Sequence, residues 1–292
     1  MKDYDGGCCF RTLGKGSDIR VLWELTTKCN LRCNWCHTRT QESGFLPFDA
    51  IADGLKALKK ANVKEIIFSG GEPLLRSDLF SILEEANYHG FKLDLCTNGT
   101  LIDQNMAHQL KRYLSEISIS LDSYLPEKHD LIRGVSHSFE KTLRGIQYLQ
   151  DEGIEIHIIS MCCDDTCDDM HELLRLLESL KLHSVTLLGL IEIEGVKTPF
   201  HLSDVTRVKA RTMIDQYRKQ FVHMSINTKK IFTDDCQNMC PAGVTMLGID
   251  AFGTLMPCIL KKDGKKLLFD EWAHGENWIL HKTEGRSDAA GN

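Results

Sequence analysis

Six short apolar runs, rich in β-branched residues, recur along the first two thirds of the chain. They cover residues 19–26, 65–71, 92–99, 116–122, 154–161 and 184–190. Segments with helical periodicity separate them, and in one of these Ile51, Leu55 and Leu58 fall on one face. Alternating strands and helices are typical of a parallel sheet with right-handed connections. Six units are fewer than the eight of a closed barrel, so we predict an α/β fold built as a partial, TIM-like (βα)6 barrel.

Polar and turn-forming residues predict where the elements begin and end. We expect a helix over 77–90, with Ser77 as its N-cap and Gly90 at its end. After about Ile191 the pattern changes to a linker that leads into a helix from about residue 204. The predicted domains are an N-terminal extension (1–18), the barrel (19–195) and a small C-terminal domain with a hairpin and helix (196–292).

The composition is that of an ordinary globular protein. The 292 residues are 42% hydrophobic and 26% charged, with a formal net charge of −6. This balance provides no electrostatic reason to expect a nucleic acid or an anionic membrane as a partner. The first residues lack the apolar core of a signal peptide, and no apolar run approaches the roughly 20 residues that span a bilayer. We therefore predict a cytoplasmic protein.

The chain contains twelve cysteines, and three of them form a tight C-x3-C-x2-C motif after the first strand: Cys29, Cys33 and Cys36. Without a secretory signal, clustered cysteines more often bind metal or carry out redox chemistry than form a disulfide framework. Closed zinc sites and electron-carrying Fe–S clusters use four protein ligands. A site with three leaves one position open for a small molecule. The alternative is a zinc knuckle that takes the adjacent His37 as its fourth ligand.

The stretch CNLRCNWC resembles the signature of the radical S-adenosylmethionine (radical SAM) superfamily. Its further motifs SGGEP, CTNGT and SISLDS follow at the ends of the second, third and fourth predicted strands. The resemblance covers about residues 19–190 and implies that Cys29, Cys33 and Cys36 bind three irons of a [4Fe–4S] cluster. SAM would chelate the fourth iron and be cleaved to a 5′-deoxyadenosyl radical that abstracts a substrate hydrogen. The electron would come from a reductant such as flavodoxin or ferredoxin.

The accessory motifs predict contacts to SAM, although each also has a structural interpretation. Gly70 and Gly71 allow backbone to approach a ligand closely, and Glu72 offers a carboxylate to an ammonium group. The same three residues would also suit a strand-to-helix turn. The resemblance implies that Ser120 contacts SAM and that Arg133 contacts the carboxylate of SAM. It adds three positions that are equally explained by packing or turn formation: Trp35, Asn98 and Leu190.

A second set of cysteines lies near the C-terminus: Cys236, Cys240 and Cys258. Their segment resembles the opening half of the SPASM extension, or its shorter twitch version, with a G-x4-C turn across a small hairpin. The resemblance implies a second, auxiliary Fe–S cluster that is one ligand short. The alternatives are a structural zinc and a hairpin without a cluster. The missing ligand would be the substrate or one of five other cysteines: Cys8, Cys9, Cys162, Cys163 and Cys167.

These features predict a radical SAM enzyme that modifies a peptide or protein by forming a thioether or carbon–carbon link, by epimerisation or by oxidation. Ile259 stands where sulfatase-maturing members have an acidic residue, which argues against that activity. The residues before the first strand are too few for a leader-binding winged helix, so we expect any such domain to be a separate protein. The alternative is tailoring of a sugar, nucleotide or cofactor precursor. A non-enzymatic Fe–S or zinc module is a third interpretation, but it does not need the SGGEP motif.

Overall fold

The computed structural model describes residues 19–190, 196–229, 231 and 246–256. The chain divides into two compact units, which we describe separately. The described part of unit I comprises 29–41, 95–190, 196–229 and 231, and that of unit II comprises 19–28, 42–94 and 246–256.

Unit II is built on a small sheet in which β1 (Ile19–Glu24) is central. It pairs in parallel with β2 (Val63–Ser69) on one side and β8 (Met246–Ile249) on the other. β8 continues into an antiparallel hairpin with β9 (Leu255–Met256). Its helices are α1 (Phe48–Lys60), the 3-10 turn η2 (Pro73–Leu75) and α2 (Leu79–Tyr88). The strands β1 and β2 are almost entirely buried, as expected for the centre of a parallel sheet.

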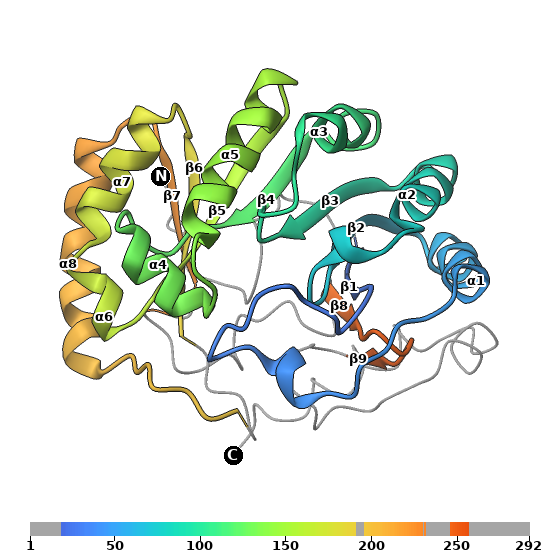
Figure 1. Ribbon diagram of the computed structural model, residues 1–292, viewed down its shortest axis with the longest axis horizontal. Coiled ribbons are helices and arrows are strands. Elements are labelled where there is room, and N and C mark those ends of the chain that lie inside the picture. The colour runs from blue at the N-terminus through green and yellow to red at the C-terminus, as the bar shows by residue number, and fades with distance from the viewer. Residues whose placement is uncertain (1–18, 191–195, 230, 232–245, 257–292) are drawn as a thin grey trace, which may run out of the picture. The chain divides into compact units, whose positions relative to one another are not determined.

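Unit I carries five parallel strands in the order β3-β4-β5-β6-β7. They are β3 (Lys92–Thr97, which the chain enters from unit II at Leu95), β4 (Glu116–Ser120), β5 (Glu155–Cys162), β6 (Ser184–Gly189) and β7 (Ser225–Lys229). The helices are η1 (His37–Thr40), α3 (Gln104–Leu110), α4 (Pro126–Arg133), α5 (Ser138–Asp151), α6 (Asp164–Cys167), α7 (Met170–Ser179) and α8 (Asp204–Gln220). Figure 1 shows α5, α7 and α8 along the outer side of strands β5 to β7.

All six predicted strands are present, each within two residues of its predicted start, and the prediction of an α/β fold with a parallel sheet is confirmed. Strand β7 was missed, because Ile226 is the one apolar residue in its sequence SINTK. β7 is nevertheless hydrogen-bonded in parallel to β6 along its whole length. The partial barrel and the twitch-type domain stay predictions.

The predicted start of the second helix is wrong. α2 begins at Leu79, with Asp78 rather than Ser77 as its N-cap. Arg76 explains the difference: its buried guanidinium donates to both carboxylate oxygens of Asp78, at 2.9 and 2.7 Å, and to the carbonyl of Leu25 at 2.8 Å. These bonds fix the chain just before the helix. The other end agrees with the prediction, because Gly90 adopts a left-handed conformation (φ +73°) beyond the last turn.

The C-terminal region is described in part. The helix expected from about residue 204 is α8. It begins after Ser203, whose hydroxyl caps it by accepting from the amide of Thr206. The β8–β9 hairpin is present, and Gly253 has the left-handed backbone (φ +84°) of its turn. Cys236, Cys240 and Cys258 lie outside the described residues, as does the predicted extension 1–18. Within the described ranges, no helix has the length and apolar character that crossing a membrane requires.

Candidate cofactor site

The cysteine motif lies on an irregular loop of unit I between β1 and η1. Cys29 is exposed, Cys33 is buried and Cys36 is half-buried. The thiol of Cys29 accepts from the amide of Leu31 at 3.4 Å, and the amide of Cys36 donates to the carbonyl of Cys33 at 3.3 Å. The loop therefore folds back on itself and presents its three thiols at different depths.

Helix α4 anchors this loop through backbone contact. The amide of Arg32 donates to the carbonyl of Arg133 at 3.0 Å. The next residue, Gly134, has φ +70°, and a Cβ there would lie 2.4 Å from the carbonyl oxygen of Arg32. A side chain at this position would collide with the cysteine loop, so glycine is required both for the left-handed turn and for the close approach.

A cluster of polar side chains ties the loop to the end of β3. The amide group of Asn98 donates to Asn30 Oδ1 at 2.9 Å, and Asn30 Nδ2 donates to Thr100 Oγ1 at 2.8 Å. Thr100 closes the circuit by donating from its hydroxyl and its amide to Asn98 Oδ1, at 2.6 and 2.9 Å. Asn98 was predicted to contact SAM or form a turn. The structure shows that it fixes the segment between the first two cysteines.

An ion pair is buried behind Cys33. Arg133 Nε lies 2.6 Å from Asp122 Oδ2, and the two side chains are 7% and 1% exposed. Arg133 Nη1 also lies 3.8 Å from the sulfur of Cys33. Burial raises the pKa of the Cys33 thiol, and the neighbouring guanidinium opposes that rise. A positive charge is thus held beside a side chain that would bind metal as a thiolate.

Trp35 places the cysteine loop at the carboxyl ends of the strands. Its ring packs against a buried cluster that includes Cys163 and Leu190, the residues directly after β5 and β6. The Arg133 guanidinium lies 5.3 Å from the ring centroid, within the range of a cation–π contact. The indole Nε1–H is buried and has no acceptor among the residues that the structure describes.

Unit I thus holds the cysteine loop together with five of the predicted cofactor residues: Trp35, Asn98, Ser120, Arg133 and Leu190. Ser120 is half-buried at the last position of β4. Leu190 is buried, and its amide donates to the carbonyl of Cys162 at 3.0 Å. Chemistry at the carboxyl ends of parallel strands is the general rule in such folds.

Unit II contains the other three predicted residues. A Cβ on Gly70 (φ +127°) would lie 2.4 Å from the carbonyl oxygen of Thr26, and one on Gly71 would lie 2.1 Å from that of Lys28. These glycines were expected to let backbone approach a ligand closely. In the structure, the backbone carbonyls of Thr26 and Lys28 occupy the space beside them. Glu72 is fully buried, and its carboxylate accepts from the amide of Leu74 at 3.1 Å, which caps the η2 turn.

The donor set matches an Fe–S cluster in its chemistry. Three thiols on one loop are the ligand type that such clusters take, and the buried guanidinium beside Cys33 offsets thiolate charge. Within the described ranges, no three His, Cys, Asp or Glu side chains are grouped tightly enough to share a single metal ion.

Comparison with known proteins resolves the family. Residues 23–177, more than half of the chain, match the model of the radical SAM superfamily. The chain belongs to the radical SAM superfamily. Its members use a [4Fe–4S] cluster and SAM, so the predicted class of enzyme and these two cofactors are confirmed at the level of the family.

Radical SAM proteins of several named activities are related to this chain in sequence. An AdoMet-dependent heme synthase of Nitratidesulfovibrio vulgaris is 33% identical over 177 residues, which are 58% of this chain and 48% of that protein. The chain therefore spans about half the length of the heme synthases that it matches. A probable GTP 3′,8-cyclase of Methanococcus maripaludis is 28% identical over 286 residues, covering 90% of this chain and 92% of that protein.

Solved radical SAM structures share the fold. Streptococcus suis SuiB bound to S-adenosylmethionine superimposes with a TM-score of 0.75 at 18% identity, covering 89% of this chain and 67% of that chain. The anSMEcpe protein with bound AdoMet superimposes with a TM-score of 0.73 at 18% identity, covering 91% and 82%. At this level of identity the comparison supports the fold alone.

The sequence had singled out neither Asn30 nor His129, and Asp122 only by its position after the fourth strand. The radical SAM motif around β4 carried the one available signal, because Asp122 lies within the motif SISLDS, two residues after the end of that strand. His129 is fully buried, and its Nδ1 accepts from the amide of Asp122 at 3.3 Å. Burial lowers the pKa of His129 to about 4, so the imidazole is neutral at pH 7.

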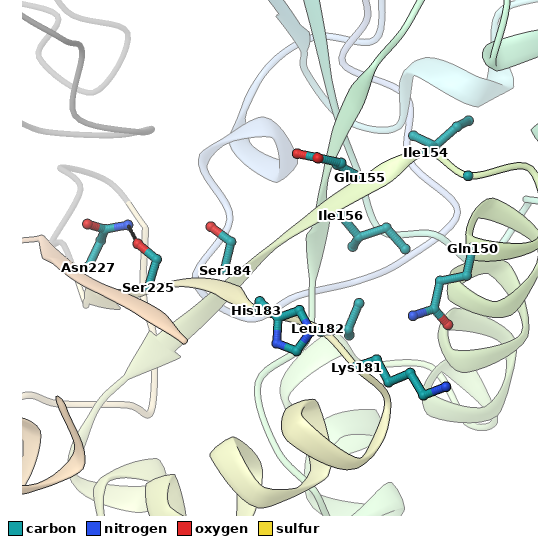
Figure 2. Close-up of a pocket in the computed structure, with 11 residues that line it drawn as sticks. Gln150, Ile154, Glu155, Ile156, Lys181, Leu182, His183, Ser184, Ser225 and Asn227 are labelled. Carbon is teal, nitrogen blue, oxygen red and sulfur yellow. Dashed lines mark hydrogen bonds between the residues drawn. The ribbon is translucent and has the colours of Figure 1, made fainter. Parts of the chain in front are cut away.

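A separate pocket lies at the other end of the unit I strands. Its volume is about 660 Å³, and Figure 2 shows it at the starts of β5, β6 and β7. Polar side chains line much of it, including His183, Ser184 and Asn227. Cys163 and Leu190 follow the opposite ends of β5 and β6, so this pocket is distinct from the region around the cysteine loop.

Proposed function

We propose that this radical SAM protein modifies a peptide or protein, using SAM cleavage to abstract a hydrogen from the substrate. The observation that favours this substrate class is the β8–β9 hairpin with Gly253 in its turn, where the sequence resembles a SPASM-type extension. The fold likeness to SuiB bound to its precursor peptide SuiA, with a TM-score of 0.76, is consistent with the same class.

In this proposal Cys29, Cys33 and Cys36 hold the cluster, and SAM bound there supplies the 5′-deoxyadenosyl radical. The chain's own residues position the cysteines. Arg133 holds its charge against Cys33 because Asp122 fixes the guanidinium from behind.

Further residues are proposed to bind SAM itself. Glu72 offers its carboxylate to the methionine ammonium, and Arg133 meets the SAM carboxylate. Contacts to the rest of the molecule are proposed for Trp35, Gly70, Gly71, Asn98, Ser120 and Leu190. An auxiliary cluster at Cys236, Cys240 and Cys258, the flavodoxin or ferredoxin reductant and the cytoplasmic location are part of the same proposal.

A second candidate is the modification of a small molecule. Sequence relatives of this chain are named for heme synthesis, Fe-coproporphyrin III synthesis and GTP cyclisation. The match to the GTP 3′,8-cyclase runs along nearly the full length of both chains, which favours a compact substrate over a peptide.

The radical SAM chemistry is tested by anaerobic reconstitution with iron and sulfide. With SAM and dithionite, the wild-type protein is expected to form 5′-deoxyadenosine, and the Cys29/Cys33/Cys36→Ala variant to form none. Iron that remains in this variant would support the auxiliary cluster. Absence of 5′-deoxyadenosine from the wild type, with zinc bound instead of iron, would refute the proposal.

The substrate class is tested by isotope transfer. Extract from cells grown in deuterated medium is added to the reconstituted protein, and deuterium in 5′-deoxyadenosine is measured by mass spectrometry. A peptide substrate predicts transfer that is lost when the extract is first digested with a broad-specificity protease. Transfer that survives digestion, or stimulation by GTP or iron coproporphyrin III, would favour the second candidate.

A further inference from the structure

The hydroxyl group of Thr38 lies against the sulfur of Cys36. The Oγ1 and Sγ atoms are 3.0 Å apart, within hydrogen-bond distance. Either atom can donate while Cys36 is a thiol, but a cysteine binds metal as a thiolate, which has no proton to give. When Cys36 holds a cluster, the Thr38 hydroxyl is therefore the donor and the sulfur is the acceptor.

The local backbone holds Thr38 in this position. Cys36 is the N-cap of the 3-10 turn η1, and the carbonyl of Thr38 accepts from the amide of Gln41 at 3.3 Å. Thr38 is only 5% exposed. Within the described part of the chain, Cys36 is the one hydrogen-bond partner of its hydroxyl. Buried hydroxyl groups in proteins are nearly always hydrogen-bonded, and the contact with the sulfur satisfies this one.

The other two cysteine sulfurs have donors of a different kind. The amide of Leu31 donates to Cys29, and the guanidinium of Arg133 lies beside Cys33. A backbone amide has no side chain to remove, and Arg133 belongs to a buried ion pair. The Thr38 hydroxyl is a neutral side-chain donor, so its contribution can be removed without changing any charge.

We propose that the Thr38 hydroxyl raises the reduction potential of the cluster by donating a hydrogen bond to the Cys36 sulfur. Reduction transfers one electron from the reductant to the cluster and changes no covalent bond of Thr38. The sulfurs share the added negative charge, so a donor to one of them stabilises the reduced state more than the oxidised state. This inference rests on the proposed function, because it requires the cluster at the cysteine motif.

The alternative is a purely structural role, in which the bond only shapes the loop, as local threonine bonds often do. Removing it would then lower the iron content or the stability of the protein. The potential of any cluster that still forms would be unchanged. The potential therefore separates the two roles, whereas enzymatic activity would respond to both.

The test measures the midpoint potential of the reconstituted full-length chain under anaerobic conditions, by stepwise addition of dithionite followed by EPR. The signal that changes when SAM is added afterwards identifies the cluster with the open iron. Thr38→Val removes the hydroxyl and keeps the branched shape. Its equilibrium constant for one-electron reduction is expected to fall roughly three- to tenfold, which lowers the potential by about 28–59 mV. Thr38→Ser keeps the hydroxyl and is expected to match the wild type.

Two further variants make the result specific. Thr38→Ala removes the same hydroxyl and is expected to lower the potential as Thr38→Val does. The matched control is Thr186→Val, because Thr186 is buried on β6 and its hydroxyl pairs with His157 at 2.9 Å rather than with a cysteine. This control is expected to keep the wild-type potential. An unchanged potential in Thr38→Val, or loss of iron from both Thr38→Val and Thr38→Ala, would overturn the proposal.

The outcomes distinguish this inference from the proposed function. If the wild-type chain forms no reducible cluster that responds to SAM, the proposed function fails and this inference fails with it. A SAM-responsive cluster whose potential does not depend on the Thr38 hydroxyl would contradict this inference alone.

Discussion

Arg133 and Asp122 form a buried ion pair, with 2.6 Å between Nε and Oδ2, although they belong to different elements. Asp122 follows β4, whereas Arg133 is the last residue of α4. Asp122 is fixed in turn, because its Oδ1 accepts from the amide of Met161 at 2.9 Å. The family resemblance predicts that Arg133 contacts SAM. The structure shows that the carboxylate of Asp122 orients the Arg133 guanidinium beside the cysteine loop.

Arg133→Met is expected to destabilise the protein by about 3–5 kcal/mol, because it leaves the buried Asp122 carboxylate without its counter-ion. The measurement is anaerobic urea unfolding. Arg175→Met removes an exposed arginine from α7 and is expected to cost less than about 0.5 kcal/mol. Equal losses in the two variants would show that the ion pair has no special role.

Gly134→Ala is expected to be far more damaging than Gly153→Ala. Both glycines are left-handed, with φ of +70° and +67°, so each alanine incurs the same backbone penalty of roughly 1–2 kcal/mol. A Cβ at Gly134 also meets the Arg32 carbonyl at 2.4 Å, whereas one at Gly153 meets nothing within 4 Å. Unfolding free energy and iron content are measured. Only Gly134→Ala is expected to reduce iron binding, because it displaces the cysteine loop.

Asn30 and Asn98 are expected to be energetically coupled through their direct hydrogen bond. A double-mutant cycle with alanine at each position should return an interaction free energy of about 0.5–1.5 kcal/mol. The two single variants should also bind iron less well, since each frees the segment after Cys29. Additive effects would mean that the polar cluster does not hold the loop.

His129 is expected to make the protein sensitive to mild acid. Its pKa is lowered to about 4 by burial, against 6.5 when unfolded, so the unfolded chain binds the extra proton between these values. This contribution to the free energy of unfolding is fully present above pH 6.5 and is lost as the pH falls toward 4. At pH 5 the loss is about 2 kcal/mol.

The check is urea unfolding at pH 7 and pH 5 for the wild type and His129→Asn, whose side-chain oxygen can still accept from Asp122. The wild type should lose about 2 kcal/mol more than the variant between the two pH values. Exposed His183→Asn is the control and should behave as the wild type does. Parallel losses in wild type and His129→Asn would contradict a buried neutral imidazole.

The sequence by itself determined the features that repeat locally. Period-two and period-3.6 patterns located six strands, the helix of 204–220 and the left-handed glycine at position 90. Spacing alone marked Cys29, Cys33 and Cys36 as a three-ligand site, because those cysteines are neighbours along the chain. The family match then covered residues 23–177, the part of the chain that contains these motifs.

Only the tertiary structure decided which distant side chains meet. It paired Arg133 with Asp122, joined Asn98 to Asn30, and filled the space beside Gly70 with the chain's own backbone. It also showed that Asp78, not Ser77, is the N-cap of α2. The buried guanidinium of Arg76 donates to the Asp78 carboxylate and fixes the chain there. Local patterns depend on neighbours a few residues away, whereas these contacts depend on how separate elements pack and on the need to pair every buried charge.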